Sequence, residues 1–197
     1  IGDVIGPTNP IDTWSTLGYF GRFSYNFKEK YLFEFNGRYD GSSKFEDGDR
    51  FGFFPSAAIG YNIHREDFWE PTFGNTFNQF KVRLSYGQLG NQNVGSYLYL
   101  SNIPINTRLG WIVDGLRPNY ANIPGIVSPD ITWEITATKN LGFDLAFLNN
   151  RLTSTIDIYE RETDKMFGPS GALPAVLGTN PPQTNSASLK TNGWELT

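Results

Sequence analysis

Few residues in this sequence have the types and spacing that covalent chemistry requires. His64 is the single histidine and cysteine is absent, so no thiolate or histidine pair can bind a metal ion or activate a nucleophile. We interpret His64 as a surface residue at a strand end. The segment Gly87–Gly90 lacks the lysine and the serine or threonine of a phosphate-binding loop. We expect no enzymatic activity, no catalytic residue, no metal site and no cofactor.

The acidic segment Glu46–Asp49 offers carboxylate oxygens, which hard cations prefer, but its spacing differs from that of a calcium loop. We interpret it as a solvated loop, with a cation site as the alternative. The net charge is −4 and the basic residues are scattered, so nothing indicates a nucleic-acid surface.

Four aromatic residues in the long segment 92–130 are the candidates for binding a substrate or a partner: Tyr97, Tyr99, Trp111 and Tyr120. Their rings could stack on a sugar or pack against a lipoprotein. The alternative is that they pack among loops or form an aromatic girdle at a membrane boundary.

The chain is organised around residues 131–164, where apolar and polar side chains alternate. A period of two gives a strand one apolar and one polar face. Asn149-Asn150 suits a two-residue type I′ turn, because asparagine tolerates positive φ. Pairing across that turn sets Phe143 opposite Ile156 and Asp144 opposite Thr155, so both strands agree on which face is apolar. Each strand is roughly 14–18 residues long, against a usual length of about 5–6.

Other segments show the same alternation. We predict strands at 14–27, 31–40, 51–64, 79–91 and from about 189, a three-residue turn at 28–30, one helical turn around 66–70 and a short strand at 97–100. Seven polar residues on the polar face are expected to line a lumen or bind a plug, and most of them to pair across strands: Arg22, Glu34, Arg38, Lys81, Arg83, Glu134 and Asp144.

The predicted connections alternate in length: 28–30, 65–78 and 149–150 are short, whereas 41–50, 92–130 and 165–188 are long. An up-and-down barrel in an outer membrane has short periplasmic turns and long extracellular loops. No run of about 18 apolar residues indicates a transmembrane helix, but a transmembrane strand carries apolar residues only at alternate positions. The pattern predicts an all-β, antiparallel, up-and-down transmembrane β-barrel segment of about seven strands.

Several stretches resemble the SusC/RagA family of TonB-dependent outer-membrane transporters of Bacteroidetes-type bacteria. They are Lys30-Tyr31-Leu32, Arg38 to Phe45 (RYDGSSKF), Phe51 to Tyr61 (FGFFPSAAIGY), Phe80 to Asn91 (FKVRLSYGQLGN), Trp133-Glu134, Asn149 to Leu152 (NNRL) and Asn192 to Leu196 (NGWEL). Their order fits the barrel region of the family from about Trp14 to Thr197, while the loops match loosely.

The resemblance implies a barrel of about 22 strands with a plug, a SusD-like surface lipoprotein as partner, and energy from TonB. We expect residues 1–197 to be part of one such barrel domain within a longer chain, without the plug and the TonB box. The expected location is the outer membrane, in contact with its lipid, and the expected function is import of an oligosaccharide or oligopeptide. The alternative is a soluble or surface-attached β-rich glycan-binding module.

Overall fold

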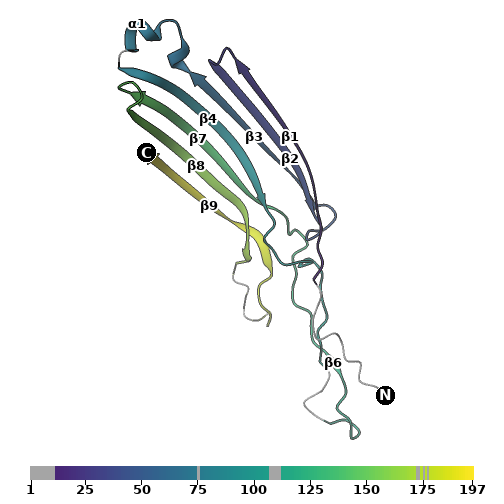
Figure 1. Cartoon of the computed structure of the whole chain (residues 1–197). Coiled ribbons are helices and arrows are strands. Elements are labelled where there is room, and N and C mark those ends of the chain that lie inside the picture. Colours follow the sequence, from purple (N-terminus) through teal and green to yellow (C-terminus); the bar gives the residue numbers. More distant parts are fainter. Residues whose placement is uncertain (1–11, 75, 107–111, 172–173, 175, 177) are drawn as a thin grey trace.

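The strands of this chain form one curved layer. The computed structural model describes residues 12–74, 76–106, 112–171, 174, 176 and 178–197. Seven strands pair in the order β1-β2-β3-β4-β7-β8-β9 (Figure 1), each antiparallel to the next. They are β1 (Thr16–Phe27), β2 (Tyr31–Ser42), β3 (Phe51–Asn62), β4 (Phe77–Asn91), β7 (Glu134–Phe147), β8 (Leu152–Pro169) and β9 (Gln183–Leu196). The predicted all-β, antiparallel, up-and-down fold is confirmed.

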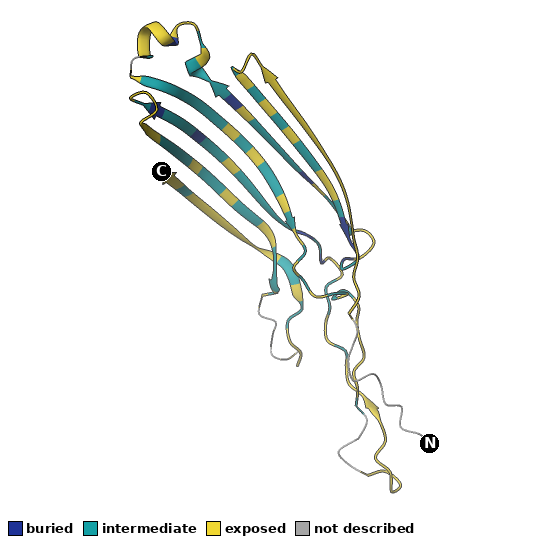
Figure 2. Ribbon diagram, in the orientation of Figure 1, coloured by how far each residue is buried: buried dark blue, intermediate teal, exposed yellow. Residues whose placement is uncertain are grey.

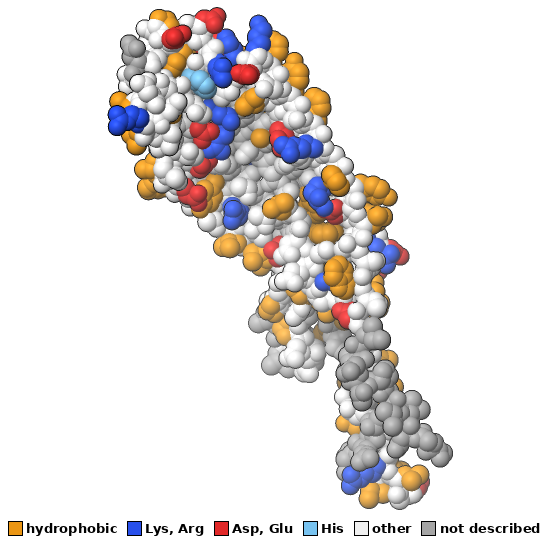
Figure 3. All heavy atoms as spheres, viewed as in Figure 1, with side chains coloured by type: hydrophobic (Ala, Val, Ile, Leu, Met, Phe, Trp, Pro, Cys, Tyr) orange, Lys and Arg blue, Asp and Glu red, His pale blue; other side chains and the backbone are white. Residues whose placement is uncertain are grey.

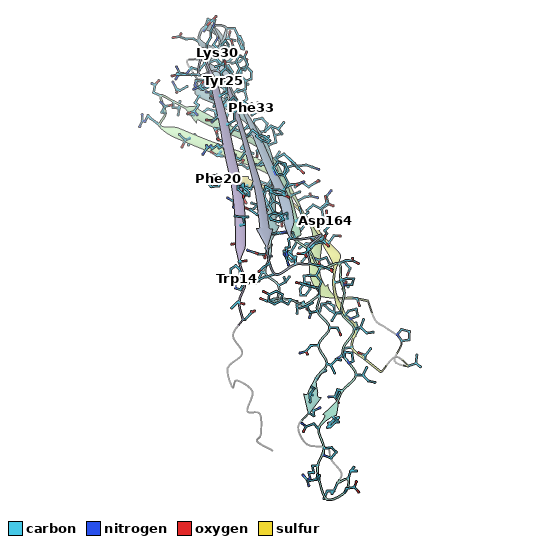
Figure 4. The ribbon with its side chains drawn as sticks, turned by 90° about the vertical axis from the view of Figure 1, so that its right-hand side faces the viewer. Trp14, Phe20, Tyr25, Lys30, Phe33 and Asp164 are labelled. Carbon is cyan, nitrogen blue, oxygen red and sulfur yellow. The ribbon has the colours of Figure 1, made fainter. Side chains whose placement is uncertain are left out.

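The connections between strands differ at the two ends of the sheet. One end holds the turns 28–30 and 148–151 and the connection 63–76, which contains η1 (Ile63–Arg65) and α1 (Trp69–Phe73). The other end holds 43–50, 92–133 and 170–182, and from it the pair β5 (Ile105–Asn106) and β6 (Tyr120–Ala121) extends away from the sheet (Figure 1). Figure 4 shows Lys30 at the first end and Trp14 and Asp164 toward the second.

The register of the central hairpin agrees with the sequence-based prediction. Phe143 pairs with Ile156 and Asp144 with Thr155. Asn149 and Asn150 have φ values of 56° and 63°, and Leu148 also has positive φ at 52°. Arg151 N donates to Leu148 O at 3.3 Å, which closes the turn. The three-residue turn 28–30 is confirmed as well, since Phe27 pairs with Tyr31.

Some predicted boundaries and elements were wrong. Residues 97–100 form a turn, closed by Leu100 N donating to Tyr97 O at 3.0 Å, and the short strands lie at β5 and β6 instead. The loop predicted at 165–188 is shorter, because β8 continues to Pro169 and β9 begins at Gln183. The helical turn predicted around 66–70 is two elements, η1 and α1.

The odd-numbered side chains of β1, β2 and β3 share one face, which we call the outward face. Phe23 pairs with Phe35 and Tyr25 with Phe33, and all four rings are exposed (57, 40, 54 and 39%). Phe143 and Ile156 continue this face on β7 and β8 and are half-buried. Figure 2 shows exposed and half-buried residues along the middle of the strands, with buried residues few. Within the described residues, no second layer of protein therefore covers the middle of this face.

Lys139 is a charged residue at a position where the alternation of residues 131–147 calls for an apolar one, and the structure explains it. It lies on the outward face beyond the last apolar pair, Leu141 with Ile158. Its Nζ binds Glu160 at 3.1 Å, and Glu160 also binds Lys190 on β9 at 3.0 Å. On β7, β8 and β9, charged side chains thus replace apolar ones on the outward face toward the long loops.

A small apolar core joins the long loops to the sheet. Phe45, Phe54, Ile131 and Trp133 are buried and pack together. The Trp133 ring lies 5.3 Å from the rings of both Phe45 and Phe54, and its Nε1 donates to Arg50 O at 3.0 Å. The alternation through residues 131–164 predicts Trp133 on the outward face, and this prediction is wrong: Trp133 precedes β7 and packs against the 43–50 loop. Among the described residues, no helix is long and apolar enough to cross a membrane.

Candidate functional site

The face opposite the outward face, here called the inner face, carries the seven polar residues selected from the sequence. Arg22, Glu34 and Arg38 lie at even positions of β1 and β2, between the outward aromatic residues. In the strand register, Lys81 lies opposite Asp144, and Glu134 lies opposite Asn91. Figure 3 shows acidic and basic side chains grouped along the middle of this face and hydrophobic side chains along its margins.

Arg83 is the centre of the largest ion-pair cluster on the inner face. Its Nε and Nη2 donate to the two carboxylate oxygens of Asp144 at 2.9 and 3.0 Å, and Nη2 also reaches Asp157 on β8 at 3.3 Å. Asn140 Nδ2 donates to Asp157 Oδ1 at 2.8 Å. Bidentate arginine–carboxylate pairs have strong directional preference, so this cluster fixes side chains across three strands.

Gly142 makes the space that this cluster occupies. It pairs with Arg83 on one side and Asp157 on the other. A Cβ at this position would lie 2.7 Å from Arg83 Nη2 and 2.6 Å from Asp157 Oδ1. A side chain at residue 142 would therefore force the guanidinium or the Asp157 carboxylate to shift.

The remaining polar residues of the inner face make smaller pairs. Arg22 binds Glu34 across β1 and β2, as predicted for cross-strand pairing. Arg38 instead binds Asp40 on its own strand, with Nε to Oδ2 at 3.0 Å. Lys81 is half-buried and makes no ion pair with any described residue.

A hollow of about 490 Å³ lies between these charged groups. Small inner-face residues line its floor, among them Ser24, Ala58, Gly60 and Ser85, with Glu34 and Lys81 also in its lining. The lining therefore carries an acidic residue from β2, Glu34, and basic residues from β4, Lys81 and Arg83.

The structure brings two of the four loop aromatics together. The rings of Tyr97 and Tyr99 lie 6.3 Å apart in a T-shaped arrangement, and Tyr97 Oη donates to Thr13 O at 3.0 Å. Tyr120 lies in β6, paired with Asn106. Trp111 lies outside the described residues. Among the described residues, Tyr97, Tyr99 and Tyr120 therefore do not form a single cluster.

The two positions considered for metal chemistry have ordinary contacts. His64 Nδ1 lies 3.2 Å from Phe80 O. Asp47 pairs with Arg50 at 2.6 Å. Within the described ranges, no group of three or more His, Cys, Asp or Glu side chains has the arrangement of a metal site.

Sequence reasoning missed two groups. Asp157 belongs to the Arg83 cluster, and its place directly opposite Gly142 in the predicted hairpin register was the signal that could have revealed it. The contacts of Glu66 with Lys30, Tyr31 and Tyr61 had no such signal, because they depend on how the 63–76 connection folds.

A single-layer antiparallel sheet with one apolar, exposed face and one ion-paired face has the organisation of the wall of an up-and-down β-barrel. The family model described as TonB dependent receptor-like, beta-barrel matches residues 2–197. The chain belongs to this family and forms a segment of a larger barrel.

Individual relatives agree with this assignment. The chain is 36% identical to TonB-dependent receptor SusC of Bacteroides thetaiotaomicron over 182 residues, 91% of this chain and 18% of the relative. It is 30% identical to TonB-dependent receptor P3 of Formosa agariphila over 190 residues, 96% of this chain and 18% of the relative. The chain thus spans about a fifth of the length of these relatives.

Solved structures give the same result. A RagAB peptide importer structure in a closed-closed state matches with a TM-score of 0.77 and 27% identity, over 93% of this chain and 19% of that chain. The siderophore receptor PirA of Pseudomonas aeruginosa matches with a TM-score of 0.56 and 12% identity, over 93% of this chain and 30% of that chain. The PirA match concerns the fold alone. The resemblance to SusC and RagA proteins is confirmed by these relatives, all of which are receptors or transporters by name.

Proposed function

We propose that this chain forms part of the barrel wall and extracellular loops of an outer-membrane, TonB-dependent importer of a nutrient. The observation that carries the proposal is the contrast between the two faces of one sheet layer. Aromatic side chains such as Phe23 and Tyr25 are exposed on the outward face, whereas the inner face holds ion pairs such as Arg83 with Asp144. A lipid environment stabilises the first face, and an aqueous or protein-filled lumen stabilises the second.

The wall contributes to transport without covalent chemistry. Antiparallel pairing satisfies the backbone hydrogen bonds of the strands inside the sheet, which is the condition for crossing lipid. The inner face, with acidic Glu34 and basic Lys81 and Arg83 lining its hollow, would line the lumen or contact a plug. A closed barrel of about 22 strands would need further strands beyond β1 and β9.

The proposed substrate is an oligosaccharide or an oligopeptide, and the proposed partners are a SusD-like surface lipoprotein and the TonB complex. Support comes from similarity to SusC and to the RagAB peptide importer. Tyr97, Tyr99 and Tyr120 lie in the long connection 92–133, where a substrate or a lipoprotein would approach, and we include Trp111 of the same connection as a candidate contact.

A soluble glycan-binding module is the competing function. In such a module the outward aromatic side chains would pack against a second sheet, as in a sandwich. Phe33 and Phe35 are instead exposed, so the observations favour the barrel.

Nutrient uptake in the native host tests the proposal. A strain that lacks the whole protein would be grown on oligosaccharides or on oligopeptides as the sole carbon source and compared with the complemented strain. We expect growth to fail on one of these two substrate classes and to return on complementation. Unchanged growth on both, together with recovery of the protein in the soluble fraction, would contradict the proposal.

A further inference from the structure

The connection between β3 and β4 folds back over the outward face at the end of the sheet that has the short turns. The Trp69 ring of α1 stacks on Phe80 with a centroid distance of 5.4 Å and an interplanar angle of 26°, and Trp69 Nε1 donates to Phe77 O at 3.1 Å. Phe80 belongs to the outward row, because it pairs with Leu145. Trp69 is only 8% exposed, so α1 covers the outward aromatic row here.

The carboxylate of Glu66, which lies beside α1 in the sequence, accepts three hydrogen bonds. Glu66 accepts hydrogen bonds from Lys30 Nζ at 2.9 Å, from Tyr61 Oη at 3.0 Å and from Tyr31 Oη at 3.2 Å. Tyr31 and Tyr61 are outward-face residues whose rings stack at 5.0 Å and 5°. Tyrosine and tryptophan with an apolar ring and a bonded polar atom are typical of a membrane–water interface.

Two phenylalanines extend the apolar surface of this segment. Phe68 and Phe73 flank Trp69 and are 56% and 44% exposed. A five-residue helix is too short to be stable alone, so α1 is held by the contacts of Trp69 with the sheet. The Phe73 ring lies 5.1 Å from the Trp69 ring, which stacks on Phe80 of the outward face, while Asp67 is fully exposed. This mixture fits an interface and does not fit the hydrocarbon interior.

We propose that Ile63–Phe73 is an interfacial anchor that lies in the phospholipid headgroup region of the leaflet nearest the short turns. Phe68 and Phe73 reach the upper part of the acyl chains, and Glu66 with its three donors stays at the water boundary. The occupant of this surface is lipid, because the surface continues the face that the proposed function assigns to lipid; the inference rests on that function. Acidic side chains outnumber basic ones in the segment, so the anchor does not depend on anionic lipid.

Cysteine is absent from this sequence, so a single introduced cysteine can be labelled specifically once any cysteine elsewhere in the whole protein has been replaced. The whole protein would carry single substitutions Phe68→Cys, Phe73→Cys, Asp67→Cys or Ile59→Cys, labelled with a small fluorophore, in nanodiscs of phosphatidylethanolamine with or without phosphatidylglycerol. Brominated lipid quenches a fluorophore at the acyl chains, and iodide quenches one in water. Ile59, exposed in the middle of the outward face, is the lipid control, and Asp67 is the water control. Phe68→Cys provides a second site in case Phe73→Cys weakens the Trp69 contact.

We expect labels at positions 68 and 73 to lose fluorescence with brominated lipid, to be shielded from iodide relative to position 67, and to respond equally with and without phosphatidylglycerol. If positions 68 and 73 behave like position 67 while position 59 is quenched by brominated lipid, the anchor is wrong and the barrel stands. If position 59 is quenched by iodide and not by brominated lipid, the proposed function itself fails, and the anchor with it.

Discussion

Arg83 on β4 and Asp144 on β7 form a two-hydrogen-bond ion pair across the inner face, with distances of 2.9 and 3.0 Å. Both side chains are partly shielded from water, with exposures of 33% and 24%. Asp157 on β8 completes the cluster from the other side. The cluster of Arg83, Asp144 and Asp157 therefore links three neighbouring strands, β4, β7 and β8.

Removal of one partner should destabilise the sheet at this point. We expect Asp144→Ala to lower the free energy of unfolding by about 1–2 kcal/mol, because it leaves a half-buried guanidinium with one weaker partner, an effect reduced by its remaining exposure. The measurement is urea unfolding of the whole protein in detergent micelles, followed by tryptophan fluorescence.

Arg22→Ala is the matched control, since Arg22 is 65% exposed in its pair with Glu34. Its cost should be under about 1 kcal/mol. Equal effects of Asp144→Ala and Arg22→Ala would show that the Arg83 cluster has no special structural role.

A side chain at position 142 should disturb the Arg83 cluster. Gly142→Ala places a Cβ within 2.7 Å of the guanidinium and within 2.6 Å of Asp157. We expect a loss of about 1–3 kcal/mol from this overpacking. Gly21→Ala is the control, because a Cβ there meets no atom within 4 Å. The same unfolding assay compares the two variants, and a neutral Gly142→Ala would mean that Arg83 reaches Asp157 by another path.

Trp133 should hold the long loops in place. Trp133→Ala removes a buried ring from contact with Phe45 and Phe54, and we expect a loss of about 3–5 kcal/mol. Limited proteolysis should then cut the connection 92–133 faster than in the unchanged protein. Ile123→Ala, at a 93% exposed position, should leave the cleavage rate unchanged. Equal cleavage rates for Trp133→Ala and the unchanged protein would show that this core does not anchor the loop.

The Glu66 contacts should respond to acid. The hydrogen bond from Lys30, followed by that from Tyr61, holds the pKa of the Glu66 carboxyl below its usual range. The contribution of Glu66 to stability is therefore present above the unfolded-state pKa, about 4.3, and is lost as the pH falls through the lowered folded-state pKa. Hydrogen exchange of residues 63–73 should become faster over this acidic range.

Glu66→Gln should remove that acid response, because the amide does not titrate. Exchange in this variant should be nearly independent of pH over the same range, once the intrinsic pH dependence of exchange is corrected. A response that persists in Glu66→Gln would assign it to another group.

The sequence predicted the sheet well because its two faces impose a period of two on the residues. The register of the 143–156 hairpin followed from that period and from one asparagine turn, and both were confirmed. The same period of two also predicted that Arg83 and Asp144 lie on one face of the sheet. The position of Trp133 did not, because the alternation continues through it while its ring packs on the 43–50 loop. The contacts of Trp69 and Glu66 depend on the fold of an irregular connection, which no period describes.

The central claim is that alternate residues of these strands face lipid and an aqueous lumen. The most direct measurement is thiol labelling of the whole protein in outer membranes, with single substitutions Phe143→Cys and Asp144→Cys, a lipid-soluble reagent and a water-soluble reagent. We expect position 143 to react only with the lipid-soluble reagent and position 144 with the water-soluble one. Protection of both positions in a soluble protein would contradict the barrel and favour the binding module.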